Sequence, residues 1–137
     1  MRVSAKVDYA VRAGAELAAA AGEGPVKGDH IATAQKIPLK FLENILLDLK
    51  HAGLVQSQRG TEGGYWLAKD PAEISLADVI RAVEGPIATV RGVRPDDVAY
   101  DGAARALAAV WIELRAAMRG VREETTLADL VVRSTVD

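Results

Sequence analysis

The sequence predicts a mainly α-helical protein with one short β-hairpin and a long helix in its C-terminal part. Half of the 137 residues are hydrophobic, only 4% are aromatic and alanine is abundant, which favours helices over strands. Apolar residues recur at three- and four-residue spacing along most of the chain, which is the period of an amphipathic helix. The exception is a glycine-rich run at residues 60–64, which suits a tight turn between two strands.

Two helices are expected at the start of the chain. Ser4 is a suitable N-cap residue, so the first helix should run from about Ala5 to Ala21, before the glycines and the proline that follow. A shorter second helix is expected from about Gly28 to Gln35, with Ile31 and Ala34 facing the core.

A third helix is expected after a turn at Ile37 and Pro38, because proline suits the first position of a new helix. It should run to Ala52, and Gly53 suits the left-handed residue that ends a helix. Its apolar side comprises Leu42, Ile45, Leu46 and Leu49. The opposite side of this helix is therefore expected to face outward.

The next segment predicts a hairpin whose tip carries Arg59. Gly60, Gly63 and Gly64 allow a tight turn and a close approach of the backbone to another surface. A helix followed by a two-stranded wing with an arginine at its tip is typical of the winged helix-turn-helix, and the usual ligand of that fold is duplex DNA. The alternative is an ordinary helix and hairpin with an arginine at the surface.

The outward side of the third helix is compatible with DNA as the ligand. Lys40, Glu43 and Asn44 lie near its N-terminal end, which in helix-turn-helix proteins enters the major groove. Lysine can bind guanine or phosphate, asparagine can pair with adenine, and a carboxylate can accept a hydrogen bond from cytosine. A solvated helix side with mixed charges would have the same pattern, so it is the wing that favours DNA binding.

Three further helices are expected in the second half of the chain. After a break at residues 70–71, a capped helix should run from about Leu76 to Glu84. Residues 87–101 follow Gly85 and Pro86 and contain Gly92 and Pro95, so they predict a loop. A long helix should follow from Gly102 to Arg122, and a last short one from Leu127 to Val132.

The long helix is expected to join two copies of the chain. We assign residues 1–70 to a winged helix-turn-helix region and residues 71–137 to the connecting helix, the loop and the dimerisation helix, all within a single compact domain. The apolar side of the long helix comprises Leu107, Val110, Trp111, Leu114, Met118 and Val121. Its near-heptad spacing suits a helix pair between subunits, and an operator with two half-sites requires a dimer. The alternative is that this helix packs on its own domain.

The charge distribution fits a DNA-binding region joined to a region with another role. The net charge is −2, but residues 1–69 carry nine Lys and Arg against seven Asp and Glu, whereas residues 70–137 carry eight against twelve. Because phosphate contacts depend on the local potential, the negative total does not argue against DNA binding.

The composition excludes several classes of function. The sequence contains no cysteine, which excludes disulfides, thiolate catalysis and cysteine-ligated metals. His30 and His51 lie on different predicted helices without a paired acid, so we expect neither an enzyme nor a metal site. No apolar stretch reaches the ~18 residues of a membrane span, and no signal peptide precedes the first helix, so a cytoplasmic protein is expected.

Several stretches together resemble the Rrf2 family of bacterial transcription regulators. They are Met1–Lys6 with Tyr9–Val11, Phe41–Leu46, Leu49–Val55, Arg59–Gly60 with Gly63–Tyr65, Ile74–Gly85 and Trp111. The similarity covers nearly the whole chain. It implies a homodimer whose long C-terminal helices cross, with each winged helix entering one half-site of double-stranded DNA.

The resemblance also implies roles for individual residues. Lys40, Phe41, Glu43 and Asn44 would lie at or beside the major groove, and Arg59 would enter the minor groove, whose negative potential favours an arginine. The complete set predicted to bind DNA is Arg2, Lys6, Pro38, Lys40, Phe41, Glu43, Asn44, Arg59, Gly60, Gly63, Gly64 and Tyr65. The effector is left open among a small molecule, a protein partner and none. The rival hypothesis is a protein-interaction module that has lost operator binding.

The sequence departs from the family at the iron–sulfur site. Many members hold a cluster through three cysteines in the loop before the long helix, and that loop, Gly92 to Arg105, has none here. Asp8 stands where some members supply a further ligand from the other subunit, but one carboxylate without thiolates cannot hold a cluster. We therefore expect no cofactor, and we expect Asp8 to be a surface or interface charge.

Overall fold

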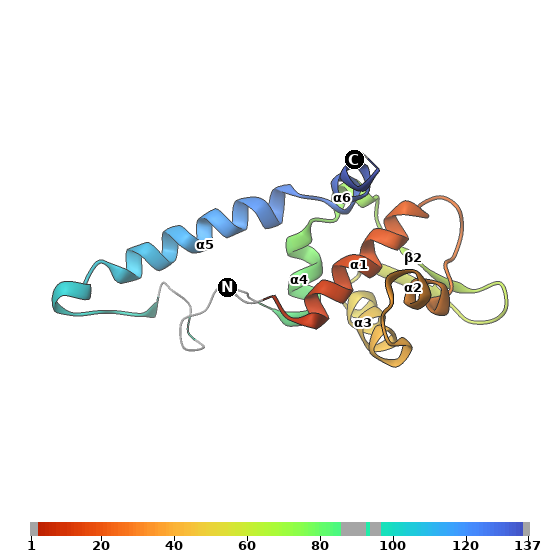
Figure 1. The fold of residues 1–137 in the computed structure, drawn as a ribbon, viewed down its shortest axis with the longest axis horizontal. Helices are drawn as coiled ribbons and strands as arrows, with labels where there is room; N and C mark the ends of the chain where they lie inside the picture. The colour runs from red at the N-terminus through yellow and green to blue at the C-terminus, as the bar shows by residue number, and fades with distance from the viewer. Residues whose placement is uncertain (1–2, 86–92, 94–96, 136–137) are drawn as a thin grey trace.

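The computed structural model describes residues 3–85, 93 and 97–135, and the mainly helical fold that the sequence predicts is confirmed (Figure 1). Its elements are α1 (Ala5–Ala19), α2 (Gly28–Gln35), α3 (Leu39–His51), β1 (Val55–Gln58), β2 (Gly64–Leu67), η1 (Pro71–Glu73), α4 (Leu76–Glu84), η3 (Gly102–Ala104), α5 (Leu107–Glu124) and α6 (Leu127–Ser134). The two strands form one antiparallel sheet. Within the described residues, no helix is both long enough and apolar enough to cross a membrane.

The core lies between α1, α2, α3 and the segments that lead into α4 and α6. Its largest fully buried side chains are Leu17, Ile31, Leu42, Ile45, Leu46, Leu49, Ile74, Val79 and Leu127. The predicted apolar side of α3 is confirmed, because all four of its residues belong to this cluster. Removing these side chains from water supplies the main favourable free energy of folding.

The inward side of α2 differs from the prediction, because Ala32 is buried and Ala34 is exposed. Hydrogen bonds to α1 set this orientation. The Gln35 side chain donates to Glu16 at 2.6 Å, and Arg12 donates to the Gln35 carbonyl oxygen at 2.7 Å. Gln35 therefore faces α1. With α2 in this orientation about its own axis, Ala32 lies inward and Ala34 outward.

Two capped helix starts are joined beside α1. Ser75 and Asp78 form a capping box at α4, and Thr126 and Asp129 form another at α6. A β-bridge between Ser75 and Thr126 connects these starts, and the Leu127 amide donates to the Ile74 carbonyl at 2.9 Å. This connection anchors the end of the chain to the helical core.

Several helix ends differ from the sequence-based prediction. The long helix was expected from Gly102, but Gly102 has a φ of 61° and begins the 3-10 helix η3, so α5 begins only at Leu107. A left-handed residue cannot lie inside a right-handed helix. At the other boundaries, α1 ends two residues and α3 one residue earlier than expected, and α5 and α6 each end two residues later. Most of the predicted loop at residues 87–101 lies outside the described residues.

Helix α5 extends away from the other helices, and it lies at the opposite end of the molecule from the hairpin tip (Figure 1). None of its 18 residues is buried. Val110, Leu114 and Val121 are 48%, 50% and 67% exposed, and the other members of the predicted apolar side, Leu107, Trp111 and Met118, are half-buried. The Trp111 indole donates to the Tyr100 hydroxyl at 3.0 Å. The apolar side of α5 is thus largely uncovered in the single chain.

Candidate nucleic-acid interface

Helix α3 presents a mixed polar and apolar surface to the outside. Lys40, Glu43, Asn44 and Leu47 are all exposed, while the opposite side of the helix packs on the core. The sequence suggested Pro38 as the first helical residue, but Pro38 is the N-cap residue. Its carbonyl accepts a hydrogen bond from the Leu42 amide at 2.9 Å. No side chain caps the N-terminal end of α3, and Lys40 in its first turn is exposed.

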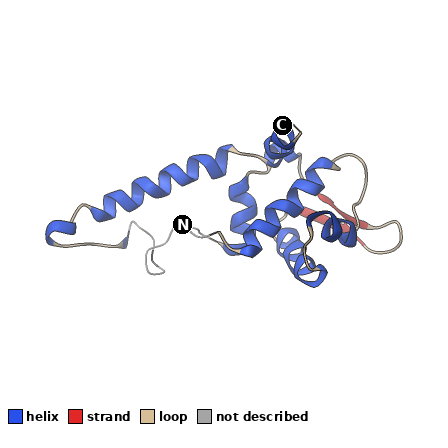
Figure 2. Cartoon of the chain, viewed as in Figure 1, coloured by secondary structure: helices blue, strands red, loops and turns tan. Residues whose placement is uncertain are grey.

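The hairpin after α3 forms the predicted wing (Figure 2). Strand β1 pairs with β2 from Val55 opposite Leu67 to Gln58 opposite Gly64. Residues 59–62 form the exposed tip, which contains Arg59 and is closed by a 3.0 Å hydrogen bond from the Gly63 amide to the Gly60 carbonyl. Arg59 therefore projects from a short, backbone-braced turn.

Two of the wing glycines are required by contacts inside the protein. Gly64 has a φ of 147°, and a Cβ added there would lie 2.6 Å from the carbonyl oxygen of Val26. A Cβ on Gly63 would collide with the carbonyl of Gln58. Both glycines are buried, so they shape the wing, whereas Gly60 is exposed with a φ of 100°.

The wing is attached to the helices on both sides. Tyr65 and Val26 exchange two backbone hydrogen bonds of 2.8 Å, which add a one-residue bridge to the outer edge of β2. The Lys27 ammonium, at the start of α2, donates to the Gly60 carbonyl at 2.8 Å. From the other side, the Lys50 ammonium donates to the Ser57 hydroxyl at 2.9 Å. These contacts set the position of the tip relative to α3.

A groove of about 500 Å³ lies between α3 and the wing. Five of the residues predicted from the sequence line it: Glu43, Asn44, Arg59, Gly60 and Tyr65. Five other residues that line the groove were not predicted to bind DNA: Leu46, Leu47, Lys50, Ser57 and Gln58. The exposure of Leu47 could have been found from the helical period, because it follows Glu43 by four residues.

The remaining predicted residues that the structure describes do not line this groove. Lys6 forms an ion pair with Asp48 of α3 at 2.9 Å. Phe41 packs edge-on against Tyr9 of α1, with ring centroids 5.5 Å apart, so it helps to hold α3 against α1. Lys40 is exposed at the N-terminal end of α3, and Arg2 lies outside the described residues.

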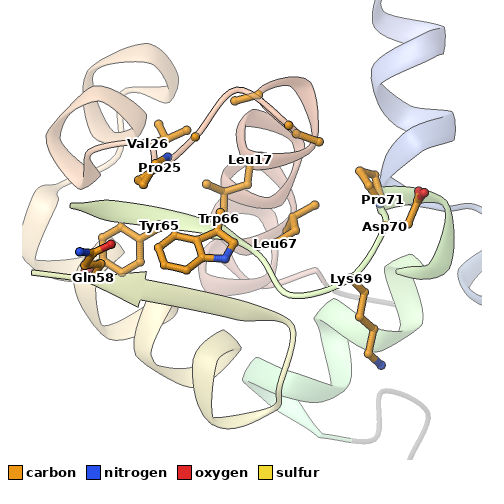
Figure 3. A pocket seen from close by; sticks show the side chains of 14 residues that line it. Leu17, Pro25, Val26, Gln58, Tyr65, Trp66, Leu67, Lys69, Asp70 and Pro71 are labelled. Atoms are coloured by element: carbon orange, nitrogen blue, oxygen red, sulfur yellow. The ribbon is translucent and has the colours of Figure 1, made fainter. Parts of the chain in front are cut away.

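A second hollow of about 680 Å³ lies behind the wing (Figure 3). Its walls come from the end of α1, the loop before Val26, β2 and residues 69–71. Figure 3 shows the rings of Tyr65 and Trp66 beside one another, with Leu17 nearby and the amine end of Lys69 directed away from them. Tyr65 lines both this hollow and the groove, so the wing separates the two.

The chain offers no thiolate for an iron–sulfur cluster, and the donor groups of its described residues do not suit a polydentate metal site. The sequence has no thiolate ligand, and no group of three His, Cys, Asp or Glu side chains suited to a metal ion occurs among the described residues. Asp8 forms an ion pair with Arg12 at 3.0 Å, one helical turn away. Its carboxylate is thus engaged by a cation of its own helix.

Comparison with known proteins agrees with this architecture. A family model described as "Rrf2: Iron-dependent Transcriptional regulator" matches residues 3–133. The chain is 54% identical over 130 residues to Rv1287 of Mycobacterium tuberculosis, which is named as an HTH-type transcriptional regulator; the match covers 95% of this chain and 81% of that protein. It is 37% identical over 130 residues to the HTH-type transcriptional regulator CymR of Bacillus subtilis, covering 95% and 89%.

Solved structures with the same fold include regulators of this kind. CymR, described as the global cysteine regulator of B. subtilis, superposes with a TM-score of 0.84 at 37% identity, over 100% of this chain and 99% of that chain. IscR of T. potens superposes with a TM-score of 0.80 at 34% identity, over 98% and 88%. With its wing, its long C-terminal helix and these relatives, the chain belongs to the Rrf2 family of transcriptional regulators.

Proposed function

We propose that this protein is a sequence-specific, DNA-binding transcriptional regulator that acts in the cytoplasm as a homodimer without an iron–sulfur cluster. The observation that supports DNA binding best is the groove between α3 and the wing. Its lining combines the polar side chains of Glu43 and Asn44 on a rigid helix with Arg59 on the hairpin tip.

Each part of this surface suits one feature of duplex DNA. A major groove about 12 Å wide admits an α-helix, and Lys40, Glu43 and Asn44 would then face base edges or phosphates from α3. Arg59 lies one hairpin away, where a long cationic side chain can enter the adjacent minor groove. Lys27 and Lys50 brace the wing. They would therefore fix the spacing between α3 in the major groove and Arg59 in the minor groove.

The uncovered side of α5 supports a homodimer. None of the 18 residues of α5 is buried in the single chain, whereas most of the stability of a helix in a protein comes from packing of its apolar side against other elements. The same apolar side from a second copy would cover Val110, Leu114 and Val121. Because α5 and the wing lie at opposite ends of the subunit (Figure 1), such a dimer would present two separated wings, as an operator with two half-sites requires.

The composition supports regulation without a cluster, although the family is described as iron-dependent. Protein-bound iron–sulfur clusters are held through thiolates, and this chain has none. Asp8, the residue that the resemblance pointed to as a cluster ligand, is paired with Arg12. We therefore propose that the protein acts without a cofactor, and we propose no effector for it.

A protein-interaction role is the second candidate, because α3 also exposes apolar side chains. Leu39, Phe41 and Leu47 are each more than two-fifths exposed, and apolar groups on an outward helix side can bind a protein. In this case the groove would accept a partner and not a duplex. Arg59 and Lys40, which are cationic and exposed, favour DNA.

Selection of duplex fragments from the source genome by the purified protein tests the proposal. We expect recovered fragments to share a two-fold related motif and to bind one dimer each. Six to ten phosphate contacts would lower the affinity ~10³-fold or more between 50 and 200 mM salt. Equal recovery of all fragments, or saturation by one subunit per site with no salt dependence, would rule out the proposed function.

A further inference from the structure

Leu47 is an apolar residue on the proposed DNA-binding side of α3. It is 49% exposed and does not belong to the buried core cluster. It lines the groove between α3 and the wing together with Glu43, Asn44 and Arg59. A leucine placed there leaves apolar surface in water, which is unfavourable unless a ligand covers it.

The other exposed apolar side chains of α3 have neighbours within the protein. Phe41 packs edge-on against Tyr9. Leu39 points toward α2, where its Cδ1 atom lies 3.9 Å from the position of a Cβ on Gly28. Leu47 instead faces the open groove. Among these three, Leu47 is the one placed to meet a ligand that enters between α3 and the wing.

Duplex DNA offers one apolar group in its major groove, the 5-methyl group of thymine, and apolar side chains pack against it. We propose that Leu47 is a specificity-determining residue that packs against the 5-methyl group of a thymine in each half-site. This inference rests on the proposed function as a sequence-specific DNA-binding protein. Two cationic residues, Lys50 and Arg59, line the same groove, which suits a polyanionic ligand.

The position of Leu47 also limits where this thymine lies. Leu47 follows Glu43 by four residues, so the two side chains share one side of α3 and are about 5–6 Å apart along it. Successive base pairs are separated by about 3.4 Å. The thymine is therefore expected about one or two base pairs from the pair that Glu43 contacts.

The test replaces each thymine of the selected operator, one at a time, by deoxyuridine, which removes only the methyl group. With the unsubstituted protein, here called the parent, fluorescence anisotropy should find one thymine position per half-site whose replacement weakens binding about four-fold. This is the effect expected from uncovering one methyl group. With Leu47→Ala, the same replacement should have no effect. The matched control, Leu39→Ala, should keep the parent's sensitivity, and circular dichroism verifies that both variants are folded.

Two results would overturn the inference while leaving the proposed function intact. In the first, the parent binds its operator specifically but no deoxyuridine replacement changes the affinity. In the second, Leu47→Ala retains the parent's ratio of affinities for thymine and deoxyuridine operators. Absence of any specific duplex binding by the parent would instead overturn both this inference and the proposed function.

Discussion

Replacement of Leu114 by aspartate tests the proposed dimer most directly. Leu114 lies at the middle of α5 and is 50% exposed in the single chain. Full burial of a leucine contributes ~1.5–3 kcal/mol, so covering the exposed half would contribute about 1 kcal/mol per subunit. The aspartate would lose this contribution and would also place an unpaired carboxylate in the interface, which costs several kcal/mol per ion.

These effects occur twice in a symmetric dimer. The combined loss is roughly 6 kcal/mol or more, and since each 1.4 kcal/mol is a factor of ten, the dissociation constant should rise by about 10⁴-fold. Sedimentation velocity at micromolar concentration should then find a folded monomer. Operator affinity should fall with it, although each α3 and wing are unchanged.

Ala116→Asp is the matched control, because it adds the same charge to the same helix. Ala116 follows Leu114 by two residues, which is about 200° around an α-helix, and it is exposed. We expect this variant to remain dimeric. The reasoning would be refuted if folded Leu114→Asp stayed dimeric, or if both variants dissociated equally.

Three further predictions concern the wing, the absent cluster and helix capping. Arg59→Ala should weaken binding to many sequences alike and lower the salt slope by about one unit. Glu43→Ala should instead relax the choice of base at one position per half-site in a selection from a randomised operator pool. The opposite pattern in this selection would reverse these roles. The purified protein should show no iron–sulfur absorbance, and its DNA binding should be indifferent to iron chelation, so stoichiometric iron and sulfide would contradict the cluster-free proposal. Burial acts to raise the pKa of Asp78, but hydrogen bonds from Ser75 and the nearby Arg81 outweigh it and hold this pKa below the ordinary value of 3.8. The stabilisation by Asp78 should therefore be complete above about pH 4 and decline as the pH falls through the folded-state pKa; Asp78→Asn should reduce this acid-dependent loss in thermal melts, and an unchanged pH profile would contradict the assignment.

Local signals in the sequence predict most of the fold. Helices α2 and α4 have the predicted bounds, and the capping box of Ser75 and Asp78 explains why the start of α4 was clear. The start of the long helix was predicted incorrectly, because the spacing of apolar residues does not reveal that the backbone of Gly102 is in the left-handed conformation. The period of a helix is a property of its own residues, whereas the position of its first residue depends on the backbone that precedes it.

The candidate site is only partly predictable for the same reason. Glu43 and Asn44 follow from the helical period and Arg59 from the glycine-rich turn, and the structure brings all three to one groove. The bracing of the wing by Lys27 was missed, because this contact joins residues 33 positions apart. The burial of Gly63 and Gly64 was also missed. The sequence indicates that these glycines have conformational freedom, but it does not indicate which backbone segments pack against them.

The hydrogen bonds of the lysines also explain how a chain of net charge −2 can bind DNA. Lys6 is neutralised by Asp48, and Lys27 and Lys50 donate to oxygens of the wing. Lys36, Lys40 and Arg59 are exposed and lie just before α3, in its first turn and at the wing tip, so they would supply three cations per subunit to this surface. Two subunits would then make about six phosphate contacts, which corresponds to a salt slope of about −5 on B-DNA. On the proposed function, DNA affinity would depend on the cations near α3 and the wing, and dimerisation would double their number without changing the charge of either subunit.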